Sequence, residues 1–271
     1  MKPYRITYPK VPRVPIIVSI PHCGTLFPKE IINDFDPALI KAPDDTDWFV
    51  DRLYDFAPSL GITMITAVFS RWVIDLNRHP DSKPLYNDGR IITELCPSTT
   101  FLGEPLYRDQ RVEVSGEEIA RRKELYFYPY HVTMQQILAD VRNQFGSVLL
   151  WDCHSIRQVV PTIRKDKFPD LILGSSDGAS ADKLLIETAV RGLSQGPYTL
   201  QHNDPFKGGY ITRTYGAPAQ NQHALQLEMT KINYMDDSER AYDPSRAKKM
   251  AELLYTTISD LAHTLISLKD R

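Results

Sequence analysis

The chain has 271 residues, and 32 Lys and Arg residues against 34 Asp and Glu residues give it a formal net charge of −2. Hydrophobic residues make up 42% and charged residues 24%, which is typical of a soluble globular protein and excludes an intrinsically disordered one. Because there is no basic excess, binding to nucleic acid by bulk charge is not expected. The apolar runs are also shorter than the roughly 18 residues that a membrane helix needs.

The cysteine count and the N-terminus indicate a cytoplasmic protein. Cys23, Cys96 and Cys153 are too few for a disulfide framework and suit a reducing compartment. The first residues lack the apolar stretch of a secretory signal. We find no internal repeat or linker-like composition, so residues 1–271 are expected to form a single domain.

Short β-branched runs alternate with helical patterns along the chain. Strands are predicted at residues 15–20, 62–69, 72–76, 147–151, 171–174 and 224–229. Helices are predicted at residues 47–56, at 115–146 with a bend at Pro129, at 179–192, and from Pro244 onward. Ser115 with Glu118 three residues later is a capping-box pattern for the long helix. This alternation predicts an α/β fold with a mostly parallel sheet covered by helices on both faces.

Two predicted strands end close to a histidine, His22 and His154. Ligands of such sheets bind beyond the carboxyl ends of the strands, so these two side chains are expected to meet. A lone histidine is more often a hydrogen-bonded structural residue, but a pair at two core strand ends favours a metal site. A catalytic zinc ion takes three protein ligands, often histidines, and leaves one position for water.

The third ligand should be another histidine or a carboxylate, and acidic residues precede the first predicted helix. Asp44, Asp45 and Asp47 all lie there. One of them could cap the helix and complement its dipole, but three exceed what that role needs. Asp45 and Asp47 both remain candidates for the ligand. Asp152, beside His154, could orient a ligand histidine or bind loop backbone.

Arg71, Asn77 and Arg78 flank the apolar residues 72–76. Arginine binds carboxylates through two parallel hydrogen bonds, and asparagine adds a donor and an acceptor. The pattern therefore indicates an anion site. The alternative is surface charge, with Asp75 paired to an arginine.

Glu228 lies within the apolar strand predicted at 224–229. A carboxylate in such a strand is seldom buried without a partner or a chemical task. Burial would raise its pKa and suit a general base beside metal-activated water. The alternative is a buried salt bridge to Arg71 or Arg78.

An ordered series of motifs between about residue 14 and residue 236 resembles the N-formylglutamate amidohydrolases, the deformylases of histidine breakdown. The matching stretches are SIPHCG (19–24), DTDW (45–48), SR (70–71) with VIDLNR (73–78), DCHS (152–155), PDLILG (169–174) with DGAS (177–180), PFKGGYITR (205–213) and HALQLEM (223–229). Each motif alone is weak, but the ordered set is specific. The resemblance implies a single-domain, three-layer α/β/α fold around a mixed sheet, related to that of the zinc carboxypeptidases.

The same resemblance implies roles for individual residues. His22 and His154 resemble metal ligands, and Glu228 resembles the catalytic glutamate. The remaining implied roles are binding of a substrate carboxylate by Asn77 and Arg78 and polarisation of the scissile carbonyl by Arg71. Because the implied substrate has two carboxylates, it needs a second anchor, and Arg213 beside Gly208 and Gly209 is our candidate for it. Carboxypeptidases place their acidic ligand three residues after the first histidine. That position is Thr25 here, so the acid is expected to come from Asp45 or Asp47.

The expected activity is metal-dependent hydrolysis of N-formyl-L-glutamate, a small-molecule substrate, to formate and L-glutamate. Zn²⁺ is the expected cofactor, and another divalent metal could occupy a similar site. Two alternatives are a related zinc amidase acting on another N-acyl amino acid or small peptide, and a non-catalytic protein that binds acidic metabolites. Nothing indicates a nucleic-acid or membrane partner, and the sequence carries no signal for the oligomeric state.

Overall fold

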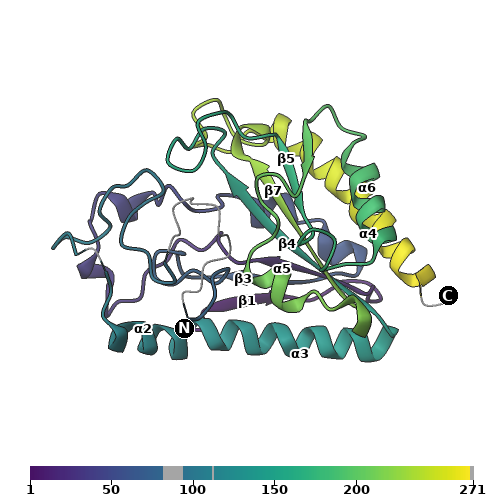
Figure 1. Ribbon diagram of the computed structural model, residues 1–271, viewed down its shortest axis with the longest axis horizontal. Coiled ribbons are helices and arrows are strands. Elements are labelled where there is room, and N and C mark those ends of the chain that lie inside the picture. The colour runs from purple at the N-terminus through teal and green to yellow at the C-terminus, as the bar shows by residue number, and fades with distance from the viewer. Residues whose placement is uncertain (82–93, 112, 269–271) are drawn as a thin grey trace.

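The computed structural model describes residues 1–81, 94–111 and 113–268. Its centre is a seven-stranded sheet in the order β1-β3-β2-β4-β7-β5-β6 (Figure 1). The strands are β1 (Tyr4–Thr7), β2 (Ile16–Ile20), β3 (Thr63–Ala67), β4 (Val148–Ile156), β5 (Leu171–Gly174), β6 (Leu200–His202) and β7 (Gln222–Thr230). Only the β1–β3 and β5–β7 pairs among them are antiparallel. The predicted mixed, mostly parallel sheet is therefore confirmed.

Helices cover both faces of this sheet (Figure 1). Helices α3 (Tyr128–Phe145) and α5 (Tyr210–Tyr215) pack on one face, and α1 (Val50–Leu53), α4 (Lys183–Leu193) and α6 (Pro244–Leu268) pack on the other. In β4, Trp151 faces the α4–α6 side and Leu150 the α3 side, because neighbouring strand residues point to opposite faces. The three-layer α/β/α architecture is thus confirmed. No helix in the described ranges is both long and apolar enough to cross a membrane.

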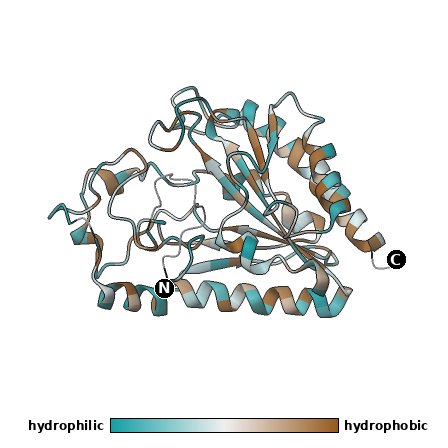
Figure 2. Cartoon of the chain, viewed as in Figure 1, coloured by the Kyte–Doolittle hydropathy of each residue, from teal (hydrophilic) through white to brown (hydrophobic). Residues whose placement is uncertain are grey.

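The long predicted helix is present in three consecutive parts. Helix α2 (Gly116–Arg122) begins after Ser115, whose hydroxyl accepts the Glu118 amide at 3.3 Å, as the capping pattern predicts. A π-helical turn at Lys123–Phe127 then leads into α3. This turn lies just before Pro129, which has no N–H to donate to the preceding turn. Figure 2 shows hydrophobic and hydrophilic residues alternating along α3, as one buried face requires.

Two sequence predictions of secondary structure were wrong. Residues 72–76 form turns rather than a strand; Trp72 and Val73 are apolar because the turn itself packs into the α3-side core. The helix predicted at 47–56 is reduced to the single turn of α1. The short elements β1, β6 and α5 have no prediction. Further single-turn 3₁₀ helices are Ile32–Asp34, Leu39–Lys41, Ala57–Leu60, Pro218–Gln220 and Lys231–Asn233.

Candidate metal centre and active site

His22, Asp47 and His154 converge near the carboxyl ends of the neighbouring strands β2 and β4. One potential ligand atom from each lies within 4.8 Å of the others, and all three residues are buried. The two imidazole rings have centroids 4.9 Å apart. His22 follows β2, His154 belongs to β4, and parallel pairing of these strands brings the two together. Asp47 is held beside them because its backbone N–H donates to the carbonyl of His22 at 2.9 Å.

Both histidines turn the same ring nitrogen toward Asp47. Nδ1 of His154 lies 3.2 Å and Nδ1 of His22 lies 3.7 Å from Oδ2 of Asp47. On the far side of the rings, Nε2 of His22 lies 2.7 Å from Asp75 and Nε2 of His154 lies 2.9 Å from Asp152. Because ionised carboxylates only accept hydrogen bonds, each Nε2 carries a proton and donates it. This arrangement is the usual support for metal-binding imidazoles.

The Nδ1 atom of His22 is buried and has no hydrogen-bond partner among the described residues. Buried polar atoms normally have a hydrogen-bond partner, so this nitrogen is available to bind a further group such as a metal ion. Burial, aided by Arg71, lowers the pKa of His22 to about 4, so its imidazole is neutral near pH 7, the form that binds metals. Two imidazole nitrogens and one carboxylate oxygen fit a divalent metal ion with a position left open.

The electrostatics of His154 differ from those of His22. Burial alone would lower its pKa, but the carboxylates of Asp152 and Asp47 raise it well above the ordinary value. In turn, the hydrogen bond and charge of His154 lower the pKa of Asp47 against the effect of burial. A metal ion at this position must therefore displace a proton from His154, which couples metal binding to pH.

Glu228 lies beside the cluster, opposite His154 in the parallel register of β4 and β7. Burial raises the pKa of its carboxyl group to about 8. The alternative salt bridge to Arg71 or Arg78 is not found; both arginines are nearer Asp75, and no described residue pairs with Glu228. A partnerless carboxyl group with a raised pKa beside a metal cluster is suited to proton transfer.

A comparison with known protein families matches residues 14–235 to the N-formylglutamate amidohydrolase model. The N-formylglutamate deformylase of Pseudomonas putida is 43% identical over 229 residues, which cover 84% of each chain. That of Pseudomonas aeruginosa is 42% identical over 260 residues, 94% of each chain. The chain belongs to the N-formylglutamate amidohydrolase family.

The structure agrees with a solved member of that family. The crystal structure of N-formylglutamate amidohydrolase from Ralstonia eutropha JMP134 superposes with a TM-score of 0.80 at 27% identity, over 98% of this chain and 99% of that one. A protein from Agrobacterium tumefaciens shares the fold with a TM-score of 0.70 at 16% identity. The family's architecture therefore extends along nearly the whole chain.

The structure distinguishes between Asp45 and Asp47, the two candidates for the acidic ligand. The carboxylate of Asp45 accepts hydrogen bonds from Nε1 of Trp72 at 2.8 Å and from the backbone of Phe101 at 3.1 Å. Asp45 therefore lies outside the cluster, and Asp47 is the acid that faces the two histidines.

Arg71 and Asp75 form a buried ion pair next to the cluster. Nη2 of Arg71 lies 2.5 Å from Oδ2 of Asp75, and its guanidinium lies 4.6 Å from the centre of the Phe101 ring. The pairing of Asp75 with an arginine, considered from the sequence, is present but fully buried rather than on the surface. Burial alone would raise the pKa of Asp75, but Arg71 and His22 hold it well below its ordinary value.

Asn77 and Arg78, predicted as a pair, occupy different environments. The Asn77 carboxamide contacts protein groups: its Nδ2 donates to Oε1 of Gln226 at 3.4 Å, and its Oδ1 accepts the Ile211 N–H at 2.8 Å. The Arg78 side chain is 23% exposed and lies 3.9 Å from Asp75. The two side chains therefore have different surroundings: Asn77 is buried against protein groups, whereas Arg78 is partly exposed.

The two glycines near Arg213 are required by close approach. A Cβ on Gly209 would lie 2.3 Å from Nδ2 of Asn77, and Gly208 has a positive φ of 107°. Arg213 lies on α5, and its Nε donates to the carbonyl of Gly208 at 2.9 Å. The turn thereby packs α5 against the Asn77 loop.

Sequence reasoning missed two polar residues that support the site. Ser19 donates to Oδ1 of Asp152 at 2.8 Å, and Gln226 accepts the Gly209 N–H at 2.8 Å. Both interrupt apolar strands on the α3-facing side, and Gln226 lies two residues before Glu228 on the same face. A polar residue at one position of an otherwise apolar strand is the signal that could have identified them.

Proposed function

We propose that this protein is a zinc-dependent amidohydrolase that converts N-formyl-L-glutamate to formate and L-glutamate in histidine degradation. The observation that carries the proposal is the buried His22–Asp47–His154 set with Glu228 beside it. Among the described residues, Nδ1 of His22 has no hydrogen-bond partner and Glu228 has no ion-pair partner. Relatives with 42–43% identity that bear the name N-formylglutamate deformylase support the choice of substrate.

The ligand set would hold the metal through Nδ1 of His22, Nδ1 of His154 and the carboxylate of Asp47. When bound, zinc supplies Lewis acidity, which polarises a carbonyl and lowers the pKa of water to about 7. Asp75 and Asp152 keep the two rings in orientation through their Nε2 atoms.

Glu228 is the general base of the proposed reaction. It accepts a proton from water as the water oxygen bonds to the formyl carbon, and it then delivers that proton to the leaving amine nitrogen as the C–N bond breaks. A pKa of about 8 allows both transfers near neutral pH. Arg71, which pairs with Asp75 next to the cluster, is the proposed group that stabilises negative charge on the formyl oxygen.

Arg78 is the proposed anchor for one substrate carboxylate, with Asn77 beside it. Its guanidinium can bind a carboxylate through two hydrogen bonds, and it is partly exposed next to the cluster. The substrate carries a second carboxylate, for which Arg213, beside Gly208 and Gly209, is the candidate from the sequence.

The test measures formate released from N-formyl-L-glutamate by enzyme with a determined zinc content. We expect release that stops after chelation and returns when zinc is added. N-acetyl-L-glutamate and N-formyl-L-leucine serve as comparison substrates. Preference for either would favour an amidase of different specificity, and a protein without metal or turnover would favour the metabolite-binding alternative.

A further inference from the structure

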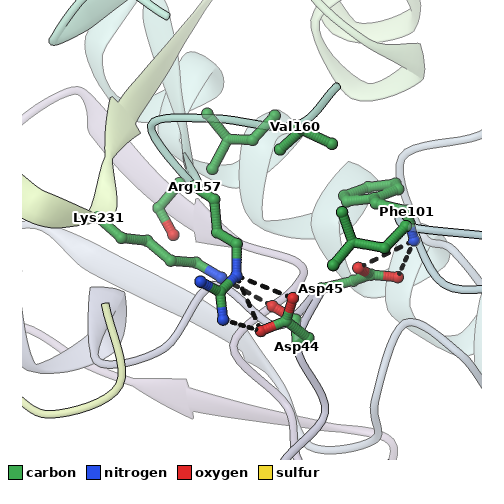
Figure 3. Close-up of a pocket in the computed structure, with 9 residues that line it drawn as sticks. Asp44, Asp45, Phe101, Arg157, Val160 and Lys231 are labelled. Carbon is green, nitrogen blue, oxygen red and sulfur yellow. Dashed lines mark hydrogen bonds and ion pairs between the residues drawn. The ribbon is translucent and has the colours of Figure 1, made fainter. Parts of the chain in front are cut away.

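A narrow pocket lies beside the metal cluster. It is lined by Asp44, Asp45, Phe101, Arg157, Val160 and Lys231, with Lys231 and Arg157 across from Phe101 (Figure 3). Ser155, which also lines the pocket, donates to Oδ1 of Asp47 at 3.4 Å. The Phe101 ring packs under the guanidinium of Arg71. The pocket therefore adjoins the proposed reaction centre on two sides.

Lys231 is the unusual residue of this pocket. Only 3% of it is exposed, yet no acidic side chain among the described residues lies within 4.0 Å of its ammonium group. Its Nζ donates to the backbone carbonyl of Asp44 at 2.8 Å. Since an ammonium group has three N–H donors, two remain for a ligand. Lysine is rarely buried this deeply without a carboxylate partner.

The acids around the pocket are already bound by other groups. Both carboxylate oxygens of Asp44 share the one Nε–H of Arg157, at 2.8 and 2.9 Å, and Oδ1 also accepts from its Nη2. Asp45 accepts the N–H groups of Trp72 and Phe101. Among the described residues that line the pocket, Lys231 is therefore the cation without a carboxylate oxygen in direct contact, although the charges of Asp47, Asp44 and Asp45 act on it from farther away.

The remaining walls of the pocket are apolar. Phe101 and Val160 face it together with Leu102 and Ile156. A buried ammonium group behind apolar walls is complementary to a short aliphatic chain that ends in a carboxylate. The side chain of glutamate, two methylene groups and a carboxylate, has this chemistry.

We propose that Lys231, rather than Arg213, binds the distal carboxylate of the substrate, with the methylene groups between Phe101 and Val160. This inference rests on the proposed function and makes Lys231 the residue that selects acidic over neutral N-formyl amino acids. Burial lowers the pKa of the Lys231 ammonium group, and a bound carboxylate would offset that desolvation.

The experiment compares N-formyl-L-glutamate with N-formyl-L-glutamine, which has the same shape and no distal charge. Lys231→Met removes the ammonium group, Lys231→Arg keeps a charge and Lys248→Met is an exposed lysine control. For Lys231→Met we expect KM for the acid to rise at least about tenfold, with kcat changing much less, because a charged hydrogen bond remote from the reacting atoms is lost. KM of Lys231→Met for the glutamine analogue and KM of Lys248→Met for both substrates should change by less than about threefold. Lys231→Arg, which keeps the charge, should raise KM for the acid less than Lys231→Met does.

If Lys231→Met raises KM equally for both substrates, Lys231 has a structural role and the proposal is overturned. The proposal is also overturned if KM rises for neither substrate. It would also be overturned if Arg213→Met, rather than Lys231→Met, raised KM selectively for N-formyl-L-glutamate. If the wild-type enzyme hydrolyses neither compound, the proposed function fails by itself. Calorimetric binding of L-glutamate and L-glutamine to the same variants then still tests Lys231, since only glutamate binding should weaken in Lys231→Met.

Discussion

Nε2 of His22 lies 2.7 Å from Oδ1 of Asp75, and the other oxygen of the same carboxylate binds Arg71 at 2.5 Å. One buried carboxylate thus orients a proposed metal ligand and neutralises the arginine next to it. It also accepts the backbone N–H of Asn77 at 2.8 Å, which fixes the turn that carries Arg71 and Asp75. The position of the metal site and that of the proposed oxyanion donor therefore depend on a single side chain.

Replacing Asp75 by Asn should weaken metal binding about 10- to 100-fold. The amide can still accept from Nε2 of His22, but it no longer carries the charge that makes the imidazole a better ligand. Competition with a chromophoric chelator measures the affinity, and Asp260→Asn on the exposed side of α6 is the control. An unchanged affinity in Asp75→Asn would show that the hydrogen bond does not tune the site.

Asp47→Asn and Asp45→Asn should differ in metal content. Removing Asp47 takes away one of three ligands, so metal should fall well below one equivalent after gel filtration. Asp45→Asn should retain the metal and lose stability instead, since Asp45 binds Trp72 and Phe101. Elemental analysis decides between them, and metal loss in Asp45→Asn alone would reverse the assignment.

The convergence of His22 and His154 could be predicted because it follows from local patterns. Two apolar strands each end near a histidine, and parallel pairing is enough to bring them together. The choice between Asp45 and Asp47 could not be predicted in this way. It depends on the Trp72 indole, which reaches Asp45 from 27 residues further along the chain.

The turn at residues 72–76 shows a second limit. Its apolar residues satisfy a strand pattern, but they are apolar because the turn is buried against α3. Periodicity reports burial and does not by itself report hydrogen-bonded geometry. The misassigned segment is also the one that carries Asp75, so its role as the link between His22 and Arg71 was missed.

Glu228→Gln should keep the metal and lose most of the turnover. The amide has the same shape but cannot accept the proton from water, and loss of a general base typically costs about 10²- to 10⁴-fold in rate. Metal content and kcat are measured on the same preparation, with Glu252→Gln on the surface of α6 as the control. A kcat near that of the wild type would remove Glu228 from the mechanism.

Gly209→Ala should disturb the site through Asn77. The added methyl group would lie 2.3 Å from Nδ2 of Asn77, closer than any relaxed contact, so the carboxamide must move away from Ile211 and His154. We expect a loss of about 1–3 kcal/mol in the free energy of unfolding, together with reduced activity. Gly116→Ala, which meets no atom within 4 Å, is the matched control and should not be destabilised. Equal effects of the two changes would contradict the steric argument.

His131 makes the stability of the protein depend on pH. It is buried on α3, its Nε2 lies 3.0 Å from the carbonyl of Leu76, and its Nδ1 lies 2.9 Å from the Tyr215 hydroxyl. Since a carbonyl only accepts, Nε2 carries the proton and Nδ1 accepts from Tyr215, which describes a neutral imidazole. Burial accordingly lowers the pKa of His131 from 6.5 to about 4.

Between pH 6.5 and pH 4 the unfolded chain binds a proton at His131 that the folded protein does not. The contribution of neutral His131 to the free energy of unfolding is therefore fully present above pH 6.5. It is lost as the pH falls toward 4, which lowers the free energy of unfolding by about 3 kcal/mol. His131→Gln removes the titrating group, so its free energy of unfolding should fall less than that of the wild type over this range. Urea unfolding at several pH values measures the difference, and a variant of the exposed His263 should behave like the wild type. If His131→Gln follows the wild-type pH profile, His131 is not the group responsible.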